Sequence, residues 1–338
     1  METNLTFKQI VETIKLSYLS RVPVFVGGPP AIGKSAAFKV ASQELGVELI
    51  DFRLTTKEPI DLRGMPDISG QFTEYKTPTE YPRDPNSRGI FLLDELGSVN
   101  PSIQVAALQM IQDRKIGSYS FPPGWMVMGA GNRGCDRAGA TRLISPLSSR
   151  MCMIEMRPDP DQWVSWFFGQ CDEHGYSDVP GMYINFRPES LYSFDPKSAS
   201  NSFPSPRTWE YAAKLIKAGI PKDIRLPILS GVLGLAVAAD YIAFEKVYES
   251  IPSIQGILMN PDTSLVPTEP STVAATVSAL AKRMVPANIG AVLKYLARCP
   301  KEMEFLGMKL GLRFSPECQN TRDFAKWFAA NQSFLLPT

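Results

Sequence analysis

Histidine and paired cysteines, the commonest ligands of transition metals, are nearly missing from this sequence. The 338 residues include one histidine, His174, and five cysteines that never form a C-x-x-C pair. A transition-metal site therefore has almost no ligands to draw on. The cysteines are also odd in number and widely scattered, which argues against a disulfide framework and for reduced thiols in a cytoplasmic setting.

An excess of charge of one sign and a long apolar run are missing as well. The 35 basic and 34 acidic residues leave a formal charge of +1, so no overall field favours nucleic acid or an anionic membrane, although a local basic patch stays compatible with this total. The most apolar stretch, residues 228–239, is uncharged, but about twenty residues are needed to span a membrane. We interpret it as a buried helix and expect no membrane association. The polar first four residues show no secretory signal.

The glycine-containing stretch Gly28-Pro29-Pro30-Ala31-Ile32-Gly33-Lys34-Ser35 is the most informative feature that the chain does have. It follows an apolar run at residues 22–26, typical of a strand, and precedes residues 36–45, typical of a helix. Strand, loop and helix together form the setting of a phosphate-binding loop, in which backbone N–H groups turn toward a polyphosphate. In that setting Lys34 reaches the β- and γ-phosphates and the Ser35 hydroxyl ligates magnesium. The alternative is an ordinary glycine-containing turn, but the complete pattern in this context favours nucleotide binding.

A second decisive stretch, residues 89–95, places two carboxylates after an apolar run. The run predicts a buried central strand, and Asp94 and Glu95 follow at its C-terminal end, where the ligands of open parallel sheets collect. We expect Asp94 to hold the magnesium shell through Ser35 and water, and Glu95 to polarise a water for in-line attack on the γ-phosphate. Alone, such a run is often only a strand that meets a solvated turn; the phosphate loop upstream favours the functional interpretation.

Residues 115–130 carry the pattern of a hairpin, with arms at 116–121 and 125–130 around a Pro-Pro-Gly turn. The second arm runs directly into Asn132. An uncharged amide at a strand end can hydrogen-bond the attacking water or the γ-phosphate without competing for magnesium. On spacing alone, a simple turn asparagine is an equal alternative.

Further candidates are arginines. Arg150 stands directly in front of the apolar strand predicted at residues 151–154, and Arg142 lies upstream of it. Such arginines are usually surface charges, but in a ring of subunits one can reach the neighbour's γ-phosphate and neutralise transition-state charge. Arg207 stands at the start of a helix opened by Ser205 and Pro206, which holds it at a rigid position.

The chain is long enough for two packed units, because single cores rarely grow far beyond about 250 residues. Strand-like runs fade after residue 157 and helical periodicity dominates, so we expect an α/β domain over residues 1–157 and a helical region over residues 158–338. Residues 55–84, polar and rich in Pro and Gly, are too long for a plain connection. They are either a functional or mobile loop or a tolerated surface insertion.

The order of these parts resembles the MoxR-type branch of the AAA+ ATPases, in particular its members with an Asp-Leu-Arg-Gly stretch after the second strand. The resemblance covers nearly the whole chain. The stretches that carry it most specifically are Gly28 to Ser35, Asp61 to Gly64, Phe91 to Glu95, Gly129 to Arg133, Arg150, and Ser205 to Glu210. It implies a P-loop AAA+ α/β core with a parallel sheet of about five strands, followed by a helical lid domain, with ATP between them.

The resemblance also implies roles for single residues. The asparagine that matches Asn132 is sensor 1 in such proteins, the arginine that matches Arg150 is the finger supplied in trans, and the arginine that matches Arg207 is sensor 2 on the lid. Members of the family often carry Leu-x-x-Arg-Phe where this chain has Leu-Ser-Ser-Arg-Met at residues 147–151. Arg142 is therefore the alternative for the trans arginine.

ATP hydrolysis with Mg2+ is the activity that the residue chemistry predicts. The resemblance implies a homo-oligomeric ring, most often a hexamer, that remodels or activates a protein partner, often one with a von Willebrand factor A domain. Residues 55–84 resemble the helix-2 insert of this family and residues 115–125 its pre-sensor hairpin. Both elements face the central pore of the ring.

Two other functions stay open. In a nucleic-acid motor, Arg83, Arg114, Lys115 and neighbouring aromatic residues would grip a strand, which the near-neutral charge disfavours without excluding it. In a nucleotide-gated scaffold, ATP would only switch assembly.

Overall fold

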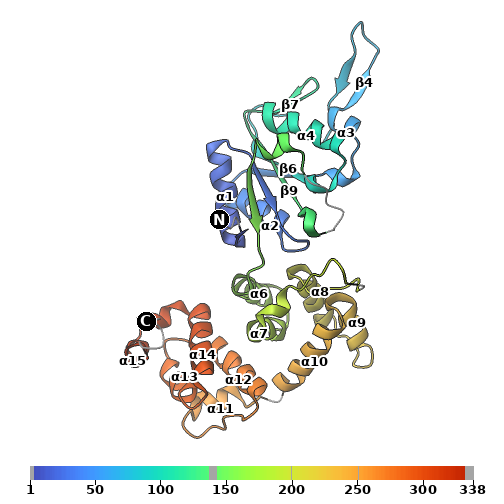
Figure 1. The fold of residues 1–338 in the computed structure, drawn as a ribbon. Coiled ribbons are helices and arrows are strands. Elements are labelled where there is room, and N and C mark those ends of the chain that lie inside the picture. Colours follow the sequence, from blue (N-terminus) through green and yellow to red (C-terminus); the bar gives the residue numbers. More distant parts are fainter. Residues whose placement is uncertain (1–3, 137–142, 199, 250, 332–338) are drawn as a thin grey trace. The chain divides into compact units, whose positions relative to one another are not determined.

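A computed structural model describes residues 4–136, 143–198, 200–249 and 251–331 of the chain. The chain forms two compact units (Figure 1). The first comprises Met1–Asp159, Phe194–Ala199 and Ser205–Arg207, and the second comprises Pro160–Ser193, Ser200–Pro204 and Thr208–Thr338. The domain boundary expected between residues 157 and 158 stays a prediction.

A parallel sheet of six strands is the centre of the first unit. From one edge to the other the strands are β1 (Asn4–Leu5), β10 (Cys152–Met156), β2 (Val24–Gly27), β9 (Gly124–Gly131), β6 (Arg88–Asp94) and β3 (Glu48–Arg53). All residues of β2, and all of β6 except the first, are buried, as expected for strands covered on both faces. The expected α/β fold class is confirmed, with one strand more because the two-residue β1 pairs with β10 at the edge.

Helices connect these strands. They are α1 (Phe7–Ser20), α2 (Lys34–Leu45), α3 (Pro59–Arg63), α4 (Pro101–Asp113) and α5 (Ser145–Ser148). Helix α2 packs against β3, β6 and β9, and α4 packs against α3, α5 and β9. Residues 55–84 form α3 and an antiparallel pair of β4 (Met65–Asp67) and β5 (Glu74–Lys76). This β4–β5 hairpin projects from the rest of the unit (Figure 1).

The hairpin expected over residues 115–130 is wrong in both arms, because the first arm, 116–121, itself contains a turn and the second arm belongs to the main sheet. Strand β7 (Lys115–Ile116) pairs antiparallel with β8 (Tyr119–Ser120), whereas β9 joins the main sheet in parallel between β2 and β6. Residues 122 and 123 are prolines, which have no N–H to donate to an antiparallel ladder, and all of β9 after its first residue is buried. A continuous buried run is typical of a central parallel strand, so this one carries Asn132 to the same sheet edge as β6.

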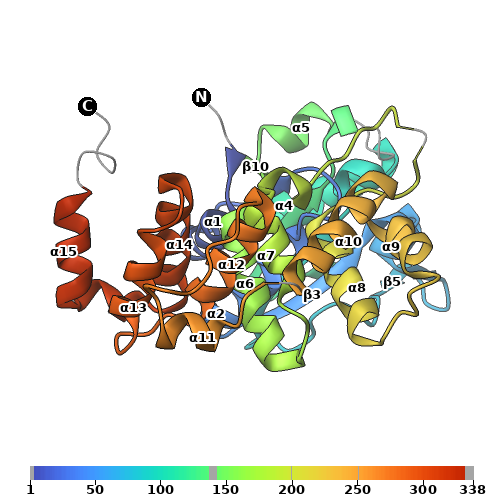
Figure 2. The same ribbon diagram turned by 90° about the horizontal axis from the view of Figure 1, so that it is seen from below.

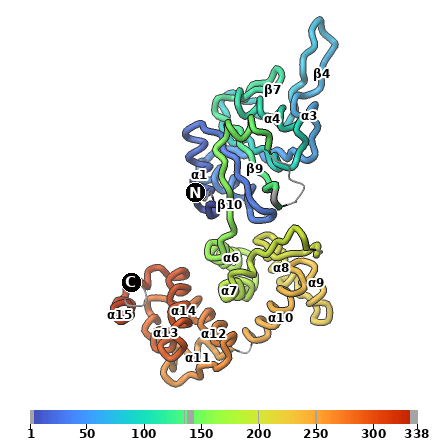
Figure 3. The backbone as a smooth tube through the Cα atoms, viewed as in Figure 1, coloured from blue at the N-terminus to red at the C-terminus, as the bar shows by residue number. Residues whose placement is uncertain are grey.

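All described elements of the second unit are helices; the chain enters this unit through α6, directly after β10 (Figure 3). The α-helices are α6 (Pro160–His174), α7 (Val179–Phe186), α8 (Pro206–Lys217, of which the first two residues belong to the first unit), α9 (Arg225–Leu233), α10 (Leu235–Glu249), α11 (Ile254–Met259), α12 (Pro270–Lys282), α13 (Ile289–Leu296), α14 (Lys301–Phe314) and α15 (Arg322–Ala330). One apolar cluster centres on Tyr183, Trp209 and Tyr241. A second lies among α12, α13 and α14, and α13 also packs against α15 (Figure 2).

The apolar stretch 228–239 is not one buried helix, as expected, but the end of α9 and the start of α10. Gly234 separates them, and its φ of 81° lies in the left-handed region that favours glycine. Leu229, Leu233 and Ala238 on either side are fully buried. None of the helices in the described part of the chain is long and apolar enough to cross a membrane.

Candidate functional site

The loop between β2 and α2 wraps around the side chain of its own lysine. Gly33, the residue before α2, has a φ of 98°, which only glycine adopts readily. A Cβ atom on Gly28 would lie 2.8 Å from the carbonyl oxygen of Met156, so the loop approaches β10 too closely for any side chain there. The two glycines of the motif are thus required by turn geometry and by close packing.

Lys34 lies almost completely inside this loop, with 8% of its surface exposed. Its Nζ donates to the carbonyl oxygens of Gly28 (3.0 Å) and Pro29 (2.9 Å) and to Oδ1 of Asn132 (2.8 Å). Burial lowers the pKa of Lys34 to about 8, while the neighbouring carboxylates of Glu95 and Asp94 partly oppose this shift. The ammonium group is therefore held in the loop by hydrogen bonds to three protein oxygens.

The two carboxylates at the C-terminal end of β6, Asp94 and Glu95, have different surroundings. Asp94, 4% exposed, accepts a hydrogen bond from Ser35 Oγ (2.8 Å) at Oδ2 and from the backbone N–H of Glu95 (2.9 Å) at Oδ1. Glu95 has a φ of 61°, a left-handed conformation that is costly for a residue with a side chain. The backbone therefore leaves the extended conformation of β6 at Glu95.

Asn132 connects the lysine with the second carboxylate. Its Oδ1 accepts from Lys34, and its Nδ2 donates to Oε2 of Glu95 at 3.3 Å. Oε2 also accepts from Ser98 Oγ at 3.2 Å. The contacts therefore form one chain, from lysine through amide to carboxylate, across the ends of three strand–loop segments.

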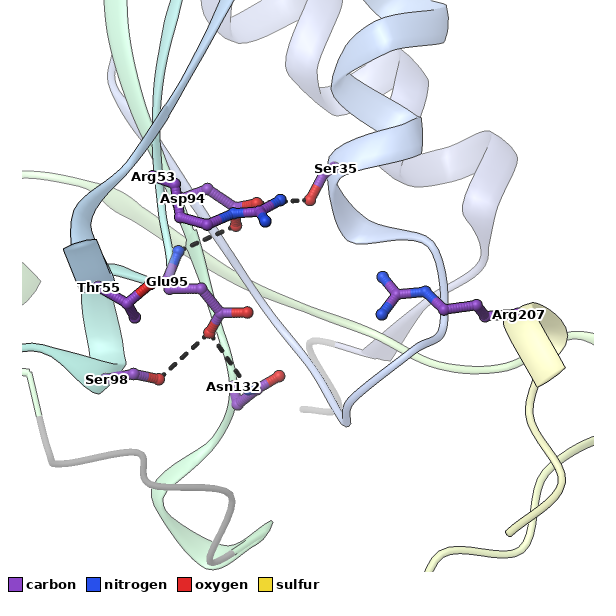
Figure 4. A pocket seen from close by; sticks show the side chains of 8 residues that line it. All are labelled: Ser35, Arg53, Thr55, Asp94, Glu95, Ser98, Asn132 and Arg207. Atoms are coloured by element: carbon purple, nitrogen blue, oxygen red, sulfur yellow. Dashed lines mark hydrogen bonds between the residues drawn. The ribbon is translucent and has the colours of Figure 1, made fainter. Parts of the chain in front are cut away.

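Ser35, the two carboxylates and Asn132 line a cavity of about 390 Å³ in the first unit (Figure 4). Its lining residues are Ser35, Arg53, Thr55, Asp94, Glu95, Ser98, Asn132 and Arg207. Five of them are residues for which the sequence predicted a role. Arg53, Thr55 and Ser98 are additions that sequence reasoning missed.

The missed residues share one signal, their place at a strand end. Arg53 is the last residue of β3 and lies opposite Asp94 in the sheet register, and Thr55 follows two residues later. Ser98 closes the 3-10 turn η2 (Leu96–Ser98) directly after Glu95. Inspection of the residues at the end of β3 would have found Arg53 and Thr55, and inspection of the few residues after Glu95 would have found Ser98.

Arg150, the first candidate for the trans arginine, is not among the residues that line this cavity. Arg150 is exposed and donates to Gln112 Oε1 (2.5 Å) and to the carbonyl oxygen of Pro146 (2.9 Å). Arg142 lies outside the described residues.

Ser35 and Asp94 present a hydroxyl and a carboxylate oxygen, the hard ligands that Mg2+ prefers. No cluster of three or more His, Cys, Asp or Glu side chains suited to a metal occurs in the described part of the chain. A magnesium ion here would therefore complete its shell with water and phosphate oxygens, as is usual for this ion.

Comparison with known proteins finds no matching family model and no matching curated protein. Among solved structures, the chain is similar to the RuvB Holliday junction branch migration motor of Thermotoga maritima, with 14% identity and a TM-score of 0.41 over 76% of this chain and 74% of that one. It is also similar to NtrX from Brucella abortus in complex with ATP, with 12% identity and a TM-score of 0.42 over 98% of this chain and 67% of that one. Identities this low assign no family to the chain.

Proposed function

We propose that this chain is a Mg-ATP hydrolase of the AAA+ class. The observation that carries the proposal is the cavity that Ser35, Asp94, Glu95 and Asn132 line together, with the Lys34 ammonium group hydrogen-bonded to Asn132. They come from the phosphate-loop pattern and from the ends of two neighbouring strands, β6 and β9. A lysine in a glycine-containing loop, an acidic pair and a strand-end amide are the parts that phosphoryl transfer requires.

In this proposal the loop from Gly28 to Ser35 holds the phosphates with its N–H groups and Lys34. Ser35 and Asp94 hold the magnesium ion, and Arg207 adds a positive charge as sensor 2. Glu95 accepts a proton from a water molecule whose oxygen bonds to the γ-phosphorus, while Asn132 orients that water. The bond from the γ-phosphorus to the β,γ-bridging oxygen breaks, and ADP and phosphate are the products.

We further propose a homo-oligomeric ring, most simply a hexamer, in which Arg150 completes the pocket of a neighbouring copy. Its exposure and its position away from the cavity of its own chain support this role. An arginine supplied in this way is worth several orders of magnitude in rate. Arg142 remains the alternative.

Remodelling of a protein partner, as in MoxR-type proteins, is the proposed use of the energy, with a von Willebrand factor A domain protein as the expected partner in the cytoplasm. The β4–β5 hairpin supports a contact role, because Ile68 and Phe72 near its tip are 80% and 78% exposed. Arg114, one of the residues considered for a nucleic-acid grip, instead directs Nη2 at the carbonyl oxygen of Pro122 at 2.7 Å.

The test is ATP hydrolysis by the wild type, Glu95→Gln and Arg150→Ala across protein concentration, with mass photometry on the same samples. Glu95→Gln is expected to lower turnover by about 10²- to 10⁴-fold, the usual contribution of a general base. Arg150→Ala is expected to keep ATP binding and lose turnover. Wild-type turnover per subunit is expected to rise as rings form.

Each alternative has its own outcome. Turnover that is flat with concentration in a monomer contradicts the ring. Tight ATP binding with negligible turnover identifies a nucleotide-gated scaffold. Stimulation by DNA that falls steeply with salt identifies a nucleic-acid motor.

A further inference from the structure

Ser98 is held in one position beside Glu95. Its backbone N–H donates to the carbonyl oxygen of Glu95 at 2.8 Å, which closes the turn η2. Its hydroxyl then donates to Oε2 of the same residue at 3.2 Å. Because the backbone bond already closes the turn, the hydroxyl is not needed to form it.

The two donors to the Glu95 carboxylate converge on a single oxygen. Ser98 Oγ and Asn132 Nδ2 both reach Oε2, whereas none of the described residues donates a hydrogen bond to Oε1. A carboxylate with one oxygen held and the other open is suited to accept a proton at the open atom. The arrangement orients Glu95 without occupying the atom that reacts.

The two donors differ in what else they hold. Asn132 is shared, because its Oδ1 accepts from Lys34. The three N–H donors of Lys34 are all directed at protein oxygens, so a phosphate that binds Lys34 has to replace one of them. If the Asn132 bond is the one replaced, the amide is free to turn and Ser98 alone still holds Oε2.

We propose that Ser98 is the positioning residue that keeps the Glu95 carboxylate oriented while Asn132 engages the nucleotide. This inference rests on the proposed hydrolysis and adds a residue that no sequence motif indicated. In this role the Ser98 hydroxyl acts through its hydrogen bond to Glu95.

The test compares Ser98→Ala, Ser98→Thr and the matched control Ser102→Ala. Ser102 is exposed and does not line the cavity, so its change controls for loss of a serine hydroxyl nearby in the sequence. Ser98→Ala is expected to lower kcat about tenfold, the effect of one hydrogen bond to a charged group. KM, the affinity for a fluorescent ATP analogue and the melting temperature are expected to stay near wild type. Ser98→Thr keeps a hydroxyl and is expected to recover most of kcat, while Ser102→Ala stays within about twofold.

A double mutant separates positioning of the base from a general structural role. In the Glu95→Gln background, Ser98→Ala is expected to add no further loss, because the carboxylate that it orients is gone. An unchanged kcat in Ser98→Ala overturns the proposal, as does a loss seen in KM or ATP affinity in place of kcat. The same tenfold loss in the Glu95→Gln background overturns it as well. Failure of the proposed function looks different, because the wild type itself then shows no hydrolysis.

Discussion

Each unit contains a half-buried glutamate with polar partners, Glu95 in the first and Glu245 in the second, and the two carboxylates differ in how their oxygens are hydrogen-bonded. In the second unit, Arg225 donates to both oxygens of Glu245, at 2.9 and 2.6 Å, and the Tyr241 hydroxyl donates to Oε1 at 3.2 Å. In the first unit, Glu95 lines a cavity, and both of its side-chain hydrogen-bond donors reach Oε2. None of the described residues donates a hydrogen bond to Oε1. A network in which every oxygen is taken holds helices α9 and α10 together. A network with one open atom is left able to do chemistry.

The same contrast extends to strain. Glu95 is held in a left-handed backbone conformation, whereas Arg225 and Glu245 both lie within regular helices. Local strain is characteristic of functional sites, where the surrounding structure enforces it. We therefore expect changes in the pocket to act on function and changes in the closed network to act on stability.

The largest effect on ATP binding is expected from Lys34→Ala. This change removes the buried cation of the loop, and the affinity for ATP is expected to fall by about a hundredfold or more, because a charge-assisted contact to phosphate is lost. Binding of a fluorescent ATP analogue measures it. Affinity within about threefold of wild type would contradict the assignment of the loop.

Arg225→Met tests the closed network. It leaves the Glu245 carboxylate, 14% exposed, with only Tyr241, and is expected to lower the free energy of unfolding by about 3 kcal/mol. Calorimetric melting of the full chain measures the loss. The matched control is Lys214→Met, which breaks the more exposed pair with Glu210 and is expected to cost about 0.5 kcal/mol or less.

A double change sharpens the same test. Arg225→Met with Glu245→Gln removes both charges, and is expected to recover part of the stability that the single change loses, because no unpaired carboxylate remains buried. ATP affinity is expected to stay at the wild-type value in each of these variants. Loss of ATP binding without loss of stability in these variants would contradict the expectation that the Arg225–Glu245 network acts on stability and the pocket acts on function.

The last effect is a pH dependence of stability from Lys34. Burial lowers its pKa to about 8 from the model-compound value of 10.5, so between these values the unfolded chain binds more protons than the folded chain. The free energy of unfolding therefore rises with pH in this window, and the lysine contributes no slope below it. Melting temperatures from about pH 7 to about pH 10 measure this. The melting temperature of the wild type is expected to rise relative to that of Lys34→Met as the pH rises. Parallel curves would contradict the lowered pKa.

Local patterns explain what could be predicted. The strand, loop and helix around Gly28 to Ser35 were predictable because all residues of a phosphate loop are consecutive in the sequence. The buried run before Asp94 was predictable because apolar residues without alternation indicate a strand covered on both faces. The partner of β9 was not predictable from its own residues, since an apolar arm fits a hairpin and a central strand equally well.

By itself, the sequence determined the class of fold and most of the polar residues of the pocket, because these depend on neighbours within a few positions along the chain. Only the tertiary structure decided that β9 lies between β2 and β6, that Arg53 stands opposite Asp94, and that Ser98 and Asn132 meet on one oxygen of Glu95. Strand register and side-chain convergence join residues far apart in the chain. The packing of the whole sheet sets this geometry, and a local sequence pattern contains no information about that packing.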